Sequence, residues 1–363
     1  MRGSHTPARR RRPMSRRRKV LLGAAVAALV AGGVLGYFAA FPDQAPAIVQ
    51  QAMAKVGLPV ATPPPPPTCP LTGVEAPHGR VPQRPVLAVK VENLPEARPQ
   101  AGLQSADIVV EEPVEGGITR FIALFQCHEV DRVGPVRSAR TTDPGVLAQF
   151  GKPILAFSGG ATEVLRAVDA ANLVPIDETR GGAAFTRDDA RAAPHDLYVD
   201  LRTVYRVAHD GRRPPEPLFI YADEIAGRSR KVSSIHLPFS SANADVYWAW
   251  DRREGEWRRS HGEVPHVDES GEQISATNVV VQVVDVTQSG IVDAAGNHSP
   301  DVHLTGSGKA YVLRDGRVVV GRWHRRTLED PTTFVAKDRT EIALAPGRTW
   351  IELVPSTVPI SFA

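Results

Sequence analysis

The sequence predicts an N-terminal mixed α/β domain, then a mainly antiparallel β domain, both behind a single transmembrane helix; the overall class is α/β or α+β. Three observations support this prediction. Strands, a glycine turn and helices follow one another in residues 82–220, which is typical of α/β proteins. Residues 221–363 carry β-branched runs and hairpin signals. An uncharged run of 22 residues, 20–41, precedes both.

The uncharged run is long enough to cross a membrane. At 1.5 Å per residue it spans about 33 Å, against a hydrocarbon core of ~30 Å. Nine Arg and Lys residues and no acidic residue precede it in the tail 1–19. The positive-inside rule therefore predicts a cytoplasmic N-terminus and an extracytoplasmic main body. Cleavage as a signal peptide is the alternative, but apolar regions of signal peptides are usually shorter, so we favour a retained signal-anchor.

Residues 42–81 form a predicted stem between the anchor and the first domain. Its five consecutive prolines, Pro63–Pro67, favour a stiff polyproline II segment. Cys69 lies in this stem and Cys127 in the first domain. An extracytoplasmic location permits a disulfide between them, which would join the stem to the domain; two free thiols are the alternative.

The net charge of +3 conceals two opposite parts. Without the nine basic residues of the tail, 34 basic residues face 40 acidic ones. Nucleic-acid-binding domains carry a basic surface, so the composition argues against nucleic acid as a partner of the folded part.

The strands and helices of the first domain follow from apolar runs and turn residues. A helix is expected at Ala161–Ala171 because the turn Ser158–Gly160 precedes it, and a second at Leu201–Ala208. Strands are expected in four apolar runs, several of them apolar on both faces: Val86–Val91, Ala106–Val110, Ile118–Cys127 and Pro153–Phe157.

The second domain is predicted to be built from strand pairs. Asp315-Gly316 is a strong hairpin signal between Ala310–Leu313 and Arg317–Val320. Aromatic residues alternate along another predicted hairpin; exposed, they would stack on sugars, and buried, they would fill the core. The remaining expected strands are Val246–Trp250, Trp257–Arg259, Thr277–Val286, Thr340–Ala345 and Thr349–Val354.

The densest set of candidate site residues lies between Glu92 and Arg140. Glycan cleavage needs two carboxyl groups about 5–9.5 Å apart, one of them protonated, and Glu111 with Glu115 could form such a pair. The alternative is that these glutamates make ion pairs with neighbouring arginines.

The same stretch offers a set of groups that could bind an anion. Arginine forks suit carboxylates and phosphates, and glycine turns before helices present backbone N–H groups. His195 could act as a base. The candidate ligand-binding residues are Asn93, Arg98, Arg120, Arg137, Ser138, Arg140, Ser158 and His195.

No cofactor or metal is predicted. Gly306–Lys309 partly matches a phosphate-binding loop, but His303 replaces its first glycine and a strand follows it. His261, His266 and Asp268 have only a loose resemblance to a metal-ligand set.

Several segments resemble the YerB-like family of bacterial envelope proteins. They are Val91–Phe125, Val133–Arg140, Ser158–Gly160, Ala193–His195, Gly306–Trp323 and Gly347–Pro355. The resemblance implies a two-domain, membrane-tethered, extracytoplasmic protein whose activity is unassigned; members are often lipoproteins.

Together these observations predict a membrane-anchored protein of cell-envelope biogenesis. Its expected partners are the membrane, crossed once, and a cell-wall polymer or a wall-synthesis protein. The alternative is an enzyme that cleaves peptidoglycan glycan through Glu111 and Glu115.

Overall fold

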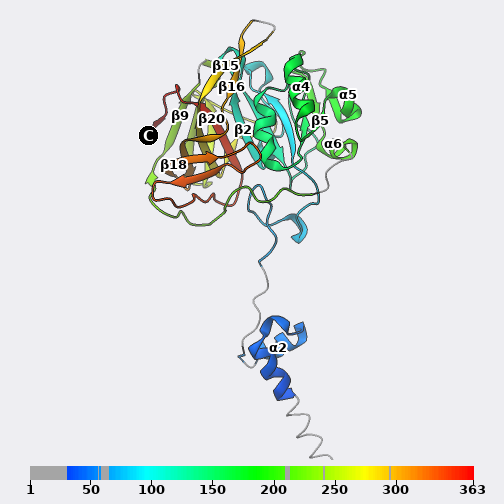
Figure 1. Ribbon diagram of the computed structural model, residues 1–363, viewed down its shortest axis with the longest axis vertical. Helices are drawn as coiled ribbons and strands as arrows, with labels where there is room; N and C mark the ends of the chain where they lie inside the picture. The colour runs from blue at the N-terminus through cyan, green and yellow to red at the C-terminus, as the bar shows by residue number, and fades with distance from the viewer. Residues whose placement is uncertain (1–30, 56, 59–64, 209–212, 240–241, 294–295) are drawn as a thin grey trace, which may run out of the picture. The chain divides into compact units, whose positions relative to one another are not determined.

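The computed structural model describes residues 31–55, 57–58, 65–208, 213–239, 242–293 and 296–363 (Figure 1). The chain divides into two compact units, Met1–Pro65 and Pro66–Ala363, which are described separately. In the first unit, residues 31–40 are helical, and η1 (Pro42–Gln44) and α2 (Ala47–Lys55) follow.

The predicted transmembrane helix lies partly outside the described residues, because 20–30 and the basic tail do not belong to them. Among the described helices, none combines the length and the apolar composition that crossing a membrane requires. The anchor therefore stays a prediction.

The last part of the predicted stem belongs to the second unit. Cys69 and Cys127 form a disulfide with Cα atoms 6.0 Å apart, and both sulfur-bearing side chains are buried. Residues 66–81, with η2 (Pro77–Gly79), are thus covalently tied to the folded body.

The first half of the second unit is mixed α/β. Strands β1 (Leu87–Glu92), β2 (Ile108–Pro113), β3 (Thr119–Phe125), β4 (Ile154–Ala156) and β5 (Val174–Ile176) form one side of a large sheet. β1, β4 and β5 are parallel, whereas β3 is antiparallel to both β1 and β2. Every residue of β1 is buried, as expected for a strand covered on both faces.

The mostly β second half continues this sheet. β20 (Thr349–Pro355) runs parallel to both β2 and β14 (Asn278–Val284), and β17 (Gly306–Arg314), β18 (Arg317–Arg325) and β19 (Thr333–Ala336) extend it antiparallel. The predicted Asp315-Gly316 hairpin is confirmed, with positive φ at both residues. The two predicted domains, 82–220 and 221–363, thus share one continuous sheet.

A second sheet consists of β12 (Val264–Pro265), β11 (Glu256–His261), β10 (Asp245–Asp251), β9 (Ser234–Pro238) and β21 (Ser361–Phe362). It packs on one face of the large sheet, where Trp248 and Trp257 are fully buried beside Trp350. These two rings therefore fill the core. Short strands β8 (Arg230–Lys231) and β13 (Ser275–Ala276) pair with β18 and β11.

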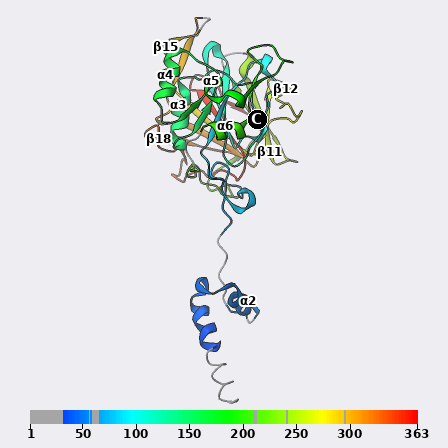
Figure 2. The ribbon, with the colours of Figure 1, turned by 90° about the vertical axis from the view of Figure 1, so that its right-hand side faces the viewer.

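The helices cover both faces of the large sheet near its β5 edge (Figures 1 and 2). Apolar residues of α3 (Thr142–Leu147) and α4 (Thr162–Ala170) pack on the face opposite the second sheet, and those of α6 (Leu201–Val207) on the other. The predicted helices at 161–171 and 201–208 are confirmed. The remaining elements are η3 (Pro95–Ala97), η4 (Leu103–Ser105), η5 (Glu115–Gly117), η6 (Ala148–Phe150), α5 (Glu178–Gly181), η7 (Gly182–Ala184), β6 (Phe185–Arg187), β7 (Leu197–Val199), η8 (Ala242–Ala244) and the hairpin β15 (Val286–Val292)–β16 (His298–Val302).

Candidate anion-binding site

The candidate site lies where the parallel strands end. Glu92 is the last residue of β1, Ser158 follows β4 and Glu178 follows β5. Open α/β sheets bind ligands beyond the carboxyl ends of their parallel strands. The topology therefore brings polar residues from three segments to a position that suits a ligand.

Three guanidinium groups, those of Arg120, Arg137 and Arg140, form what we term the arginine cluster. Arg120 lies in β3, in register between Glu92 of β1 and Glu112 of β2, and is only 6% exposed. Burial, followed by the neighbouring charges of Arg140 and Arg137, lowers the pKa of Arg120 to about 10. The chain thus holds a buried cation close to two others.

The arginine cluster has fewer carboxylate partners than guanidinium groups. Nε of Arg137 donates to Glu92 over 3.0 Å, and Nε of Arg140 donates to Glu115 over 2.6 Å. Within the described residues, Arg120 donates to the carbonyl oxygen of Ser138 at 3.3 Å, whereas its Nε has no partner and no carboxylate hydrogen-bonds to it. One guanidinium group therefore retains donors that a bound anion could accept from.

A single buried carboxylate orients both Arg137 and His195. Glu92, whose side chain is 1% exposed, contacts Nδ1 of His195 at 2.8 Å in addition to Arg137. The side chains of His195 and Arg137 are 18% and 23% exposed, and within the described residues Nε2 of His195 and the terminal nitrogens of Arg137 have no hydrogen-bond partner. The imidazole of His195 is thus positioned beside Arg137 of the arginine cluster, and both side chains are partly exposed to solvent.

Ser158 and Ser138 complete the rim of the site. The hydroxyl of Ser158 donates to Glu178 over 2.8 Å, and Arg187 joins Glu178 to Asp196. The carbonyl oxygen of Ser138 accepts from Arg120 and Arg140, which places this residue between them.

A fully buried ion-pair set lies beneath the arginine cluster. Lys90 bonds to Glu112 and, at 2.6 Å, to Asp143, and Asp143 also accepts from the backbone N–H of Arg140 at 2.7 Å. Burial raises the pKa of Glu112 to about 7, although the charge of Lys90 opposes the shift. This set connects the floor of the site to the segment that carries Arg140.

We expect Glu112 to make stability depend on pH. Its pKa is about 7 in the folded chain and ~4.3 in an unfolded one, so the stability it contributes is fully present below about pH 4 and is lost as the pH rises through about 7. When the pH is raised from 5 to 8, the free energy of unfolding of a Glu112→Gln variant should therefore increase, relative to that of the parent, by up to about 3 kcal/mol.

Urea unfolding of both proteins at the two pH values measures this gain. The comparison cancels the opposite contribution of His261 and His266, whose pKa values are lowered by burial. Equal changes in the two proteins would contradict the expectation.

The structure places Glu111 and Glu115 in separate environments with no shared partner. Glu111 is fully buried and accepts from Nη2 of Arg259 at 2.6 Å. Burial raises the pKa of Glu115, but the hydrogen bond from Ser299 and the charge of Arg140 outweigh it, so its pKa is lowered overall. A glycosidase acid needs a raised pKa, which Glu115 lacks.

Asn93 and Arg98 belong to the surroundings of Glu111 and not to the arginine cluster. Asn93 donates to Thr119 at 2.8 Å and to Glu111 at 3.3 Å, and Arg98 donates to the carbonyl oxygen of Asn93 at 2.7 Å. Burial, followed by the charge of Arg259, lowers the pKa of Arg98 to about 10.

Several residues that organise the site were missed in the sequence. Lys90 and Glu352 each interrupt an apolar run within a strand, and a charged residue in such a run signals a buried partner elsewhere. Arg259, Asp143 and Ser299 carry no comparable local signal.

Comparisons with known proteins cover both halves of the chain. Residues 71–213 match the N-terminal domain and residues 235–351 the C-terminal domain of a family described as protein of unknown function (DUF3048). YerB of Bacillus subtilis, described as a predicted lipoprotein, is 30% identical over 297 residues, which are 79% of this chain and 86% of YerB. The crystal structure of YerB protein from Bacillus subtilis matches with a TM-score of 0.69 at 28% identity, over 81% of this chain and 99% of that chain. The arginine cluster lies within the first match.

Proposed function

Because the chain belongs to the YerB-like (DUF3048) family, as its sequence segments predicted, we propose that it is an extracytoplasmic cell-envelope protein that binds an anionic group of a cell-wall polymer through the arginine cluster. The description of YerB as a predicted lipoprotein supports the envelope location, as do the predicted anchor and the disulfide, since disulfides persist in oxidising compartments.

The observation that carries the proposal is the state of Arg120. A buried guanidinium group is costly to leave without full hydrogen bonding, yet within the described residues this one makes a single 3.3 Å bond to a carbonyl group. Arg137 and Arg140 raise the positive potential around it. A bound anion that accepts hydrogen bonds from these guanidinium groups would supply the missing acceptors and offset the positive charge.

The chemistry of the anion follows from the guanidinium groups. Arginine binds carboxylates and phosphates through paired N–H groups, and His195 adds a further nitrogen. Wall polymers carry both kinds of group, on peptide stems and on phosphate-linked chains. Cleavage of glycan through Glu111 and Glu115 has less support, because each glutamate is already engaged by an arginine.

We expect Arg137→Ala to weaken binding to insoluble peptidoglycan about tenfold or more, because charge-assisted hydrogen bonds contribute about 1.5–3 kcal/mol. Pelleting of the purified full chain in detergent, over a series of polymer concentrations, measures the affinity. Inorganic phosphate and acetate as competitors show which class of anion the site prefers. The supernatant is also assayed for released fragments, which would indicate glycan cleavage.

The matched control is Arg202→Ala, an exposed arginine paired with Glu129 at 3.5 Å outside the site. The basic tail contributes equally to the peptidoglycan binding of every variant, so the differences in affinity between variants report on the site. The proposal fails if the full chain does not pellet, or if Arg137→Ala and Arg202→Ala bind alike.

A further inference from the structure

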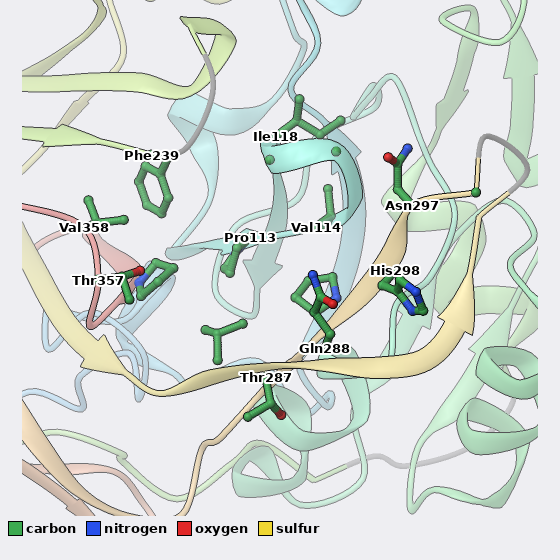
Figure 3. Close-up of a pocket in the computed structure, with 16 residues that line it drawn as sticks. Pro113, Val114, Ile118, Phe239, Thr287, Gln288, Asn297, His298, Thr357 and Val358 are labelled. Carbon is green, nitrogen blue, oxygen red and sulfur yellow. The ribbon is translucent and has the colours of Figure 1, made fainter.

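A pocket of about 610 Å³ lies beside the η5 turn, and none of the described residues that line it belongs to the arginine cluster. It lies between the η5 turn, the β15–β16 hairpin and the segment after β20 (Figure 3). Asn297 and His298 lie on one side of it, and Phe239 and Val358 on the opposite side. Its volume is within the range of about 300–1,000 Å³ that is usual for small-ligand sites.

A contact between Glu115 and Ser299 separates the pocket from the arginine cluster. Glu115 accepts from Ser299 at 2.5 Å and from Arg140 at 2.6 Å. The chain neighbours of both residues, among them Gly116 and His298, line the pocket. The carboxylate of Glu115 therefore contacts the cluster, while its chain neighbours Val114 and Gly116 form part of the pocket wall.

Two glycines in the η5 turn, Gly116 and Gly117, line this part of the pocket without side chains. Gly116 and Gly117 have φ values of 68° and 70°, which other residues rarely adopt. A Cβ atom added at Gly116 would lie 3.8 Å from the side-chain nitrogen of Asn297, which also lines the pocket, so a larger side chain would reduce the space between them. The turn thus leaves space that a ligand can fill.

His298 is the one ionisable side chain among the described residues that line the pocket. The 16 described residues that line it include no Asp, Glu, Lys or Arg. Val114, Ile118 and Val286 supply apolar surface, whereas Gln288 and Thr357 are exposed and have no side-chain hydrogen-bond partner within the described residues. Free amide and hydroxyl groups above apolar surface suit a ligand with neutral polar groups and C–H faces.

We infer that this pocket binds an uncharged sugar unit of the wall polymer whose anionic group contacts the arginine cluster. A charged unit would lose hydration without gaining a counter-charge. A purely apolar ligand would leave the free groups of Gln288 and Thr357 unused. The inference rests on the proposed function, and it identifies the polymer as a glycan with neutral and anionic groups close together.

Calorimetric titration of the purified full chain with the neutral tetramer of β-1,4-linked N-acetylglucosamine tests the inference. We expect saturable binding that weakens about fivefold or more in the double variant Gln288→Ala/Thr357→Ala, since two hydrogen bonds are lost. Arg137→Ala should leave this affinity unchanged, because the tetramer carries no charge. Gln83→Ala, an exposed glutamine outside the pocket, is the matched control.

The outcomes separate the two proposals. No binding of the tetramer, with pelleting on peptidoglycan still dependent on Arg137, overturns the inference and leaves the proposed function intact. Tetramer binding that the double variant does not weaken also overturns the inference, because the sugar then binds elsewhere. Tetramer binding confined to the pocket, without any effect of Arg137→Ala on pelleting, supports the sugar site and overturns the anion-binding role.

Discussion

Replacing Arg259 by methionine should lower the free energy of unfolding by about 3–5 kcal/mol, because it leaves a buried carboxylate without a cation. Arg259 in β11 is fully buried, donates to Glu111 at 2.6 Å and contacts Nδ1 of His266 at 2.8 Å. It joins the second sheet to β2 of the large sheet. Methionine fills similar space without the charge.

Glu111→Gln should cost less than Arg259→Met. Burial, and then the negative charge of Glu111, raises the pKa of Glu352 well above its ordinary value. Once Glu111 is neutral, Glu352 can ionise and balance Arg259. A Glu111→Gln variant that is as unstable as Arg259→Met would contradict this account.

Urea unfolding followed by circular dichroism measures both variants. The matched control is Arg258→Met, the preceding residue of the same strand, whose guanidinium pairs with Asp251 at the surface. That variant should lose less than about 1 kcal/mol, since exposed ion pairs contribute little. A loss in Arg258→Met as large as in Arg259→Met would attribute the effect to the strand and not to the buried pair.

The buried pair also decides how the glycan-cleaving alternative is tested. Lost activity in Glu111→Gln would have two explanations, a missing catalytic group or a weakened fold. Only a variant whose unfolding free energy matches that of the parent at the assay temperature separates them.

Reducing the Cys69–Cys127 disulfide should lower the free energy of unfolding by about 4 kcal/mol, since the bridge closes a loop with a sequence separation of 58. The bridge restricts the unfolded chain, and the entropic cost of folding rises without it. Both cysteines lie in a small core with Ala76, so the reduced chain keeps these contacts.

Unfolding of the full chain with and without dithiothreitol measures this effect. The double variant Cys69→Ala/Cys127→Ala should match the reduced parent and should not respond to the reductant. An unchanged denaturation midpoint in the reduced parent would contradict the prediction.

The arrangement of apolar and turn residues along the chain predicted most strands and helices of the first half and the β17–β18 hairpin of the second. The apolar run in β1, the glycine turn before α4 and the Asp315-Gly316 hairpin each depend on residues that are close in sequence. Part of the site was predictable for the same reason. Glu112 and Arg120 oppose each other across β2 and β3, which one short turn connects.

The pairings that decide the chemistry lie far apart in the chain. Glu111 and Arg259 are 148 positions apart, and Lys90 and Asp143 are 53 apart. Periodicity shows which face of a strand is buried, but not which distant side chain that face meets. The prediction that Glu111 and Glu115 form a carboxylate pair could not foresee these distant partners. In the structure Glu111 contacts Arg259, whereas Glu115 contacts Arg140.

The sequence by itself determined many local elements, the family and the concentration of charged residues between positions 92 and 140, but the strand expected at Thr340–Ala345 is wrong, since the structure has only isolated bridges there. Only the tertiary structure decided that β20 lies between β2 and β14, which joins the two halves in one sheet. It also decided that Arg120 retains free donors while Arg137 and Arg140 are paired. The reason is physical: hydrogen bonding and hydrophobic patterning act over a few residues, whereas strand order and the balance of buried charges depend on how the whole chain packs.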